Sequence, residues 1–166
     1  EIPAQDINVN NLTFRYSGTN KPVFENLNLV IPYEKTTAIV GASGSGKTTL
    51  MKLLLKFYDP NEGVIKYGKL NLRDVSQKTW RNHVGCVMQE GYIFNDTITN
   101  NIALGSDIID DKLIKYASET ANIDGFINDL PLKYNSKIGV GGLDISTGQK
   151  QRLLIARAVY KDPDIL

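Results

Sequence analysis

A glycine-rich loop carries the clearest chemistry in the sequence. Gly41 to Thr48 reads GASGSGKT and matches the pattern G-x-x-x-x-G-K-[ST] at every position. Glycines let backbone N–H groups turn inward around phosphate oxygens, and a helix beginning near Lys47 adds unpaired amides and the positive end of its dipole. We expect Lys47 to reach the β- and γ-phosphates, and the Thr48 hydroxyl to bind a Mg²⁺ ion that bridges them. The loop therefore predicts binding of a nucleoside triphosphate with magnesium.

The segments on both sides of the loop predict the local structure that such a site needs. Thr36 to Val40 is β-branched or small and predicts a short buried strand, while Thr49 to Lys56, TLMKLLLK, predicts a helix. Strand, loop and helix in this order favour the phosphate site over a simple glycine-rich turn. The residues expected to hold the nucleotide here are Gly41, Ser43, Gly44, Ser45, Gly46, Lys47, Thr48 and Thr49.

A second motif lies roughly a hundred residues further on, at the start of another expected helix. Ile145 to Arg152 reads ISTGQKQR and is followed by LLIARAVY. Ser146 and Gln149, three residues apart, form a capping box, which by itself is a structural feature. Together with the glycine-rich loop, this stretch resembles the signature motif and following helix of the ATP-binding-cassette (ABC) ATPases. The resemblance covers nearly the whole chain.

The resemblance implies a composite site for ATP and Mg²⁺ built by two copies of the domain. In the family, the signature helix of one copy faces the γ-phosphate held by the loop of the other, and free amides at a helix start suit that anion. The resemblance therefore implies nucleotide contacts from Ser146, Gly148 and Gln149. Tyr16 matches the aromatic residue that stacks on adenine, although its position alone equally fits a half-buried strand tyrosine.

Gln89 ends an apolar segment that begins at Val84 and predicts another buried strand. It matches the family's Q-loop glutamine, which implies a contact with Mg²⁺ or the attacking water. Lys47 and Gln89 are therefore the expected catalytic residues, and Thr48 and Gln89 the expected metal ligands. From the sequence pattern alone, Gln89 is an ordinary polar residue at a strand end.

The next segment, Gly91 to Ile102, resembles the part of exporter-type cassettes that meets the coupling helices of the transmembrane domains. Tyr92, Ile93 and Phe94 are three large apolar residues in a row beside a loop. Such a row suits a docking surface, and a buried corner of a helical subdomain is the competing interpretation. The partners that the resemblance implies are a second ABC ATPase domain and the transmembrane domains.

The composition fits one domain and excludes several protein classes. The 166 residues are 42% hydrophobic and 22% charged, enough for a single core. With 19 basic and 18 acidic residues the formal charge is +1, so the sequence lacks the excess of positive charge that is typical of nucleic-acid-binding proteins. No apolar run approaches the roughly 18 to 20 residues that cross a bilayer, and the N-terminus lacks signal-peptide character. The single Cys86 fits a reducing cytosol and a packing role, and we expect His83 to be structural.

The expected fold is α/β, with a P-loop NTPase core whose mixed sheet carries an antiparallel β subdomain, and with an inserted helical subdomain. Strands are expected near residues 7–16, 23–31 and 63–68, and the helical pattern from 97 to 133 has Asp110 or Asp111 as its expected helix cap. The expected parts of this single incomplete domain are 1–35 (antiparallel β part), 36–92 (P-loop core), 93–147 (helical subdomain) and 148–166 (signature helix and start of the Walker B strand).

Some expected features are absent or altered. Lys161 to Leu166 approaches the strand that in the family ends in an aspartate and a glutamate, followed later by a histidine, and none of these three is in the sequence. We therefore expect a piece of a longer polypeptide, lacking the C-terminal part of the core and hydrolysing ATP poorly or not at all. Thr147 and Glu34 stand where the family usually has glycine, and Val140 stands in place of a glutamate.

The expected function is that of the ATPase domain of an ABC membrane exporter, working at the cytoplasmic face of the cell membrane. The amino-acid sequences of the Gln89 to Ile102 segment and of the signature motif resemble those of peptide-exporting, peptidase-linked transporters. A soluble ABC protein of translation or DNA repair is the alternative. A P-loop kinase or GTPase would need an acceptor site or an N-K-x-D motif, and Asn20 to Val23, NKPV, lacks the aspartate and precedes the loop.

Overall fold

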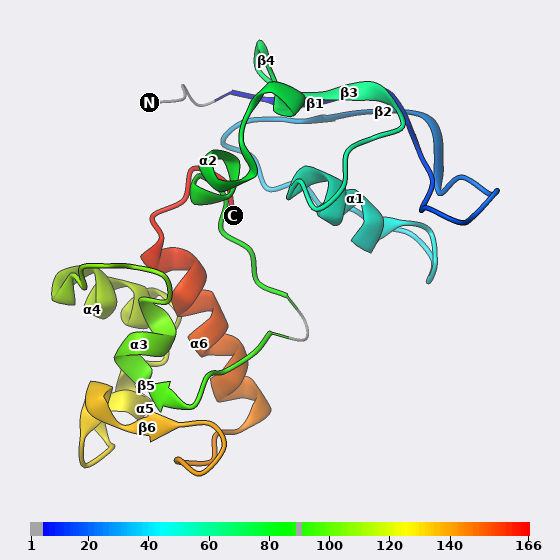
Figure 1. Ribbon diagram of the computed structural model, residues 1–166. Helices are drawn as coiled ribbons and strands as arrows, with labels where there is room; N and C mark the ends of the chain where they lie inside the picture. The colour runs from blue at the N-terminus through cyan, green and yellow to red at the C-terminus, as the bar shows by residue number, and fades with distance from the viewer. Residues whose placement is uncertain (1–4, 89–90) are drawn as a thin grey trace. The chain divides into compact units, whose positions relative to one another are not determined.

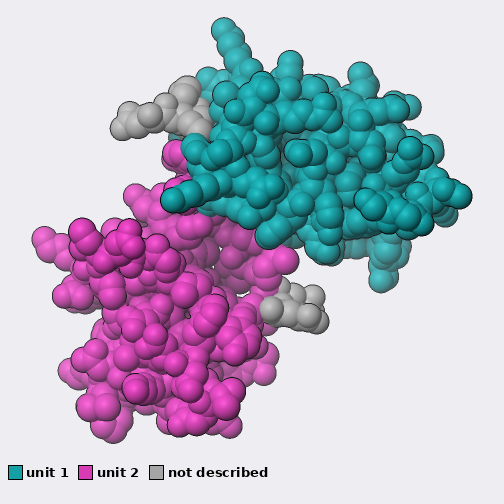
Figure 2. Space-filling view, viewed as in Figure 1, with its two compact units in different colours: residues 1–81 teal, residues 82–166 magenta. Residues whose placement is uncertain are grey.

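The computed structural model describes residues 5–88 and 91–166, and the chain divides into two compact units, residues 1–81 and residues 82–166 (Figures 1 and 2). The first unit is built on an antiparallel sheet with the strand order β2-β1-β3-β4. Its strands are β1 (Ile7–Phe14), β2 (Phe24–Ile31), β3 (Glu62–Tyr67) and β4 (Leu70–Asn71). The strands expected from the sequence near residues 7–16, 23–31 and 63–68 are therefore confirmed.

Strand β1 lies in the middle of this sheet because both of its edges are paired. Val9 lies opposite Leu29 of β2 and opposite Ile65 of β3. The apolar residues of β1 are buried and form the core with residues of the helix α1 (Lys47–Leu54), which lies along the sheet in Figure 1. The buried apolar residues of this unit are Ile7, Val9, Leu12, Phe14, Leu50, Leu53, Leu55, Ile65, Tyr67, Leu72 and Trp80.

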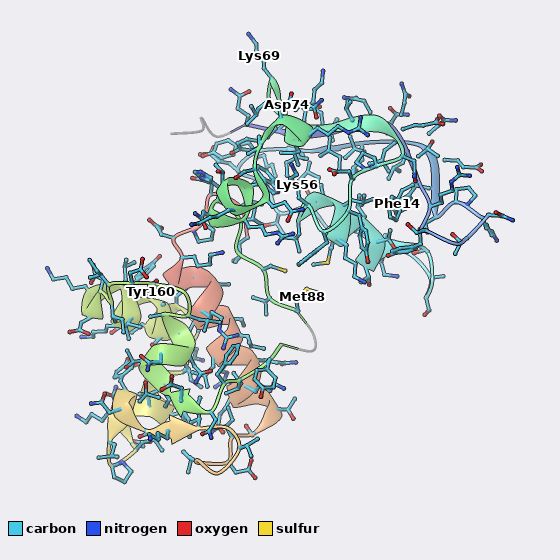
Figure 3. The ribbon with its side chains drawn as sticks, viewed as in Figure 1. Phe14, Lys56, Lys69, Asp74, Met88 and Tyr160 are labelled. Carbon is cyan, nitrogen blue, oxygen red and sulfur yellow. The ribbon has the colours of Figure 1, made fainter. Side chains whose placement is uncertain are left out.

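The carboxyl end of α1 is held by side chains from a later segment, which comprises the short 3₁₀ helix η1 (Leu72–Asp74) and the helix α2 (Gln77–Asn82). Trp80 Nε1 donates to the Leu54 carbonyl at 2.6 Å. The Arg81 guanidinium donates to the carbonyls of Leu55 and Lys56 at 2.9 and 2.8 Å. In return the buried ammonium of Lys56, labelled in Figure 3, donates to the carbonyls of Leu72 and Val75. Carbonyls that a helix end leaves without an intrahelical partner are thus satisfied by side chains.

The second unit is mainly helical, as the sequence predicts. It contains β5 (Asp96–Thr97), α3 (Ile98–Ile102), α4 (Asp111–Thr120), α5 (Asp124–Asn128), η2 (Lys133–Asn135), β6 (Lys137–Ile138) and α6 (Thr147–Tyr160). Helices α3 and α4 pack against α6, and β5 pairs with β6 (Figure 1). Asp110 is the cap of α4, since its carboxylate accepts from the N–H groups of Lys112 and Leu113. No helix in the described ranges is both long and apolar enough to cross a bilayer.

Two of the expected strands do not form in the described residues. Thr36 to Val40 is irregular and unpaired there, and Val40 is 88% exposed. From Val84 to Met88 the chain makes a single parallel bridge, between Val84 and Ile165. The prediction of two buried strands is therefore wrong for this structure. An apolar β-branched pattern fits a strand only where a neighbouring strand completes its hydrogen bonds and covers its side chains, and no such neighbour is present among the described residues.

The four-part division of the chain stays a prediction, because the structure divides the chain only once, between Arg81 and Asn82. The strand pairing differs from the expected boundaries at one point. Strand β3 falls within the range 36–92, yet it pairs with β1, so the antiparallel sheet takes a strand from beyond residue 35.

The turn after β2 gives a testable prediction. Glu34, which occupies a position where glycine is common in the resembled family, has φ +54° and an exposed side chain. A left-handed backbone strains any residue with a Cβ, so we expect Glu34→Gly to raise the free energy of unfolding by about 1 kcal/mol. Urea denaturation measures this change. The neighbouring Lys35→Gly is the control and should be neutral or destabilising; a destabilising Glu34→Gly would contradict the prediction.

Candidate functional site

The glycine-rich loop adopts a conformation that depends on its glycines. Gly44 and Gly46 have φ +79° and +95°, a region that residues with a side chain seldom enter. A Cβ on Gly46 would lie 2.7 Å from the Phe24 ring, so this residue must be glycine for β2 and α1 to approach as they do. The Ser45 N–H donates to the Ala42 carbonyl at 3.2 Å and closes the turn.

Lys47, the first residue of α1, folds its side chain back over the loop. Its ammonium donates to the carbonyls of Gly41 and Ala42 at 2.7 and 2.8 Å and lies 3.5 Å from Ser45 Oγ. These are neutral acceptors, so the lysine charge has no acidic partner in these contacts. A phosphate oxygen would therefore compete well for the ammonium.

The start of α1 is the other element that suits an anion. Its N-cap is Gly46, which makes no side-chain cap hydrogen bond, and its first turn has no acidic residue. The positive end of the helix dipole and the first-turn N–H groups thus lie next to the Lys47 ammonium. Residues of this character fit a polyphosphate, and the exposed Thr48 follows directly with a hydroxyl of the kind that magnesium accepts as a ligand. The described residues contain no cluster of three or more acidic, histidine or cysteine side chains that would hold a metal by itself.

Tyr16, two residues after the end of β1, lies next to α1. Its hydroxyl is 3.0 Å from Oγ1 of Thr49, which is buried in the first turn of the helix. The structure therefore brings together the expected aromatic residue and the expected phosphate-binding segment. The described part of Val84 to Gln89 ends at Met88, and Gln89 itself lies outside the described residues.

Ser146 and Gln149 form the capping box that the sequence predicts. The Gln149 N–H donates to Ser146 Oγ at 3.2 Å, and the Ser146 N–H donates to Gln149 Oε1 at 2.8 Å. Thr147 begins α6 in an exposed position, and a Cβ on Gly148 would have nothing closer than 4.0 Å. The N-terminus of α6 is thus ordered by its own side chains and stays open around Gly148.

The aromatic segment before β5 has two exposed rings and one residue packed in the helical unit, and the expected docking role stays a prediction. Tyr92 and Phe94 are 64% and 42% exposed, whereas Ile93 packs against the core of the helical unit. The Tyr92 and Phe94 rings contact each other edge to face, with centroids 5.0 Å apart. The middle residue thus anchors the segment, and the two rings on either side of it remain exposed.

Two residues that the sequence reasoning missed hold this segment in place. The fully buried Asn101 accepts from the Phe94 N–H at 2.8 Å and donates to the carbonyls of Phe94 and Thr97. Arg157 of α6 donates to the carbonyls of Asn101 and Tyr92 at 2.8 and 2.9 Å. Burial lowers the pKa of the Arg157 guanidinium. The signal in the sequence was a charged residue inside the apolar run LLIARAVY, where a buried charge needs partners.

Cys86 is partly covered by neighbouring atoms, and His83 has hydrogen-bond partners. Cys86 is half-buried, and burial raises the pKa of its thiol, which disfavours the reactive thiolate. His83 Nδ1 is 2.5 Å from a carboxylate oxygen of Asp164, and the His83 carbonyl accepts from the Ile165 N–H. These contacts are of a structural kind, which agrees with the roles expected for both residues.

Comparisons with known proteins agree on one family. A family model described as ABC transporter matches residues 24–166. The chain is 44% identical over 98% of its length to the lactococcin-G-processing and transport ATP-binding protein LagD of Lactococcus lactis subsp. lactis, and 43% identical over its full length to ABC transporter B family member 29, chloroplastic, of Arabidopsis thaliana. It spans 23% and 26% of those two proteins.

A solved structure is also closely similar. It is that of a bacterial Atm1-family ABC exporter with ATP bound, which matches with a TM-score of 0.90 and 36% sequence identity. The match covers 98% of this chain and 29% of the exporter chain. The fold expected from the sequence, a P-loop NTPase core with α/β content, is confirmed at this level.

The capping box gives a second testable prediction. Ser146→Ala removes the acceptor of the Gln149 N–H, so we expect the free energy of unfolding to fall by about 1 kcal/mol. Urea denaturation followed by helical circular dichroism measures the change. Thr147→Ala, one position on, is the matched control and should not destabilise, since alanine is a better helix former than threonine. Equal losses in the two variants would contradict the prediction.

Proposed function

The chain belongs to the ABC transporter family, and on this basis we propose that it is the ATP-binding domain of a membrane exporter. In this role it binds ATP with Mg²⁺ at the loop from Gly41 to Thr48 and pairs with a second ABC ATPase domain. It works at the cytoplasmic face of the membrane, next to the transmembrane domains of the exporter. The relatives described as transporters support this proposal, and no observation favours a soluble role in translation or DNA repair.

The observation that carries the proposal is the state of Lys47. Its ammonium is bonded to two loop carbonyls, beside a helix start without a side-chain cap. On nucleotide binding, Lys47 exchanges these neutral acceptors for phosphate oxygens, and the N–H groups of the loop and first turn bind the remaining oxygens. The residues proposed to hold the nucleotide are Tyr16, Gly41, Ser43, Gly44, Ser45, Gly46, Lys47, Thr48 and Thr49.

The second half of the site is proposed to come from the partner domain. Ser146, Gly148 and Gln149 stand at an ordered and open helix start, which suits the γ-phosphate held by the other copy. Each domain would then supply a loop to one nucleotide and a helix start to the other. Closure of the pair on two nucleotides is the step that would drive export.

The residues proposed for the chemistry are Lys47 and Gln89, with Thr48 and Gln89 as metal ligands. When bound, ATP supplies the phosphoanhydride bond that is hydrolysed. Lys47 would stabilise charge on the phosphates, and Gln89 would orient water or the metal. We propose that the 166 residues by themselves bind ATP but turn it over poorly or not at all, because neither Lys47, bound to phosphate, nor the Gln89 amide can act as a general base for the attacking water.

Replacing the loop lysine tests the proposed function. Lys47→Ala removes a charge-assisted contact to phosphate, so we expect ATP affinity to fall about 10- to 100-fold. Titration of the chain with ATP and Mg²⁺ in a calorimeter measures this affinity. Lys35→Ala, an exposed lysine ahead of the loop, is the control and should bind as the unmodified chain does. Unchanged ATP affinity in Lys47→Ala would overturn the assignment of the phosphate site.

A further inference from the structure

Three aromatic rings, those of Phe14, Tyr16 and Tyr58, meet near the first turn of α1 and form an aromatic cluster. The Tyr16 ring lies edge to face with Phe14, at 5.0 Å and 79°, and with Tyr58, at 5.3 Å and 89°. Phe14 and Tyr58 lie 5.7 Å apart at 47°. In Figure 3 Phe14 lies on the side of the sheet where α1 is found. Both contacts of Tyr16 have the geometry that aromatic pairs prefer, so they favour one orientation of its ring.

Tyr16 is held at two further points. Its hydroxyl is 3.0 Å from Thr49 Oγ1, and its carbonyl accepts from the Thr19 N–H and the Thr19 hydroxyl at 3.1 and 2.8 Å. The backbone is therefore fixed by a turn and the tip of the side chain by α1. The ring between these two points depends on Phe14 and Tyr58 for its tilt.

The position of Tyr58 is set by hydrogen bonds between its own segment and the end of β1. The Asn61 N–H donates to the Thr13 carbonyl at 3.0 Å, and Asn61 Oδ1 accepts from the Arg15 N–H at 2.7 Å. These bonds on both sides of Phe14 hold the chain after α1 against the strand that leads to Tyr16. Tyr58 itself is 42% exposed, so it adds little to the core, while its ring contacts the Tyr16 ring.

We propose that Tyr58 is a positioning residue for the nucleotide base. It fixes the tilt of the Tyr16 ring, so that the face meant for adenine is already oriented before the nucleotide binds. This inference rests on the proposed function, in which Tyr16 stacks on the base. A ring that is held in its binding orientation loses less side-chain freedom on binding, and that saving appears as affinity.

The proposal makes a distinction between ligands with and without a base. ATP engages both Tyr16 and the loop, whereas inorganic tripolyphosphate has the same three phosphoryl groups and no ring to stack. A residue that acts only by orienting Tyr16 affects the first ligand and leaves the second unchanged. A residue that supports the loop or the fold affects both.

The experiment titrates the 166-residue chain with ATP and with tripolyphosphate, each with Mg²⁺, in a calorimeter. We expect Tyr58→Ala to weaken ATP binding about three- to tenfold, the range of one lost aromatic pair, and to leave tripolyphosphate binding within about twofold of the original. Tyr58→Phe keeps the ring and should restore ATP affinity. Tyr33→Ala is the matched control, because Tyr33 is also 42% exposed and lies outside the aromatic cluster.

Three results would overturn the inference. Equal weakening of both ligands in Tyr58→Ala, including loss through unfolding, would make Tyr58 a structural residue. Unchanged affinity for both would remove any role in binding, and failure of Tyr58→Phe to restore ATP binding would show that the ring is not what matters. The proposed function fails separately, if Lys47→Ala leaves both affinities unchanged; in that case the inference loses its premise.

Discussion

The structure of the first unit depends on a difference between the two ends of α1, since side chains bind the backbone at one end and not at the other. At its carboxyl end, Trp80 and Arg81 donate to three successive carbonyls, and Lys56 returns two bonds to the segment that supplies them. At its amino end, no side chain caps the helix and a left-handed Gly46 is pressed against Phe24. Polar backbone groups are satisfied inside the protein where the helix is anchored, and are kept available where a ligand is expected.

The helical unit follows a different plan, in which one long helix organises a loop. Arg157 lies in the last turn of α6 and donates to the backbone carbonyls of Tyr92 and Asn101, while the Asn101 side chain binds the turn between Phe94 and Thr97. The amino end of the same helix is ordered by its capping box. A shift of α6 would therefore affect the segment of the exposed Tyr92 and Phe94, because the Arg157 side chain links this helix to the carbonyls of Tyr92 and Asn101.

Local patterns were predicted well from the sequence and long-range contacts were not. The capping box at Ser146, the Asp110 cap and the helix after the loop depend on residues a few positions apart, so their spacing carries the information. The hydrogen bonds from Trp80 and Arg81 to the end of α1 join residues about 25 positions apart in the sequence, and those of Arg157 join residues more than 50 apart. No local sequence pattern predicts such contacts. The prediction of a strand from Thr36 to Val40 failed for a related reason, since a strand is stabilised by the strands beside it.

Trp80 gives this arrangement a property of practical use. It is the only tryptophan in the sequence, it is buried, and its indole N–H is bonded to the last residue of α1 while its ring lies 5.5 Å from Tyr67. Indole emission responds to hydrogen bonding and to water. The chain therefore contains a single tryptophan, at the far end of the helix that begins at Lys47, and the emission wavelength of this residue reports on that helix without any label.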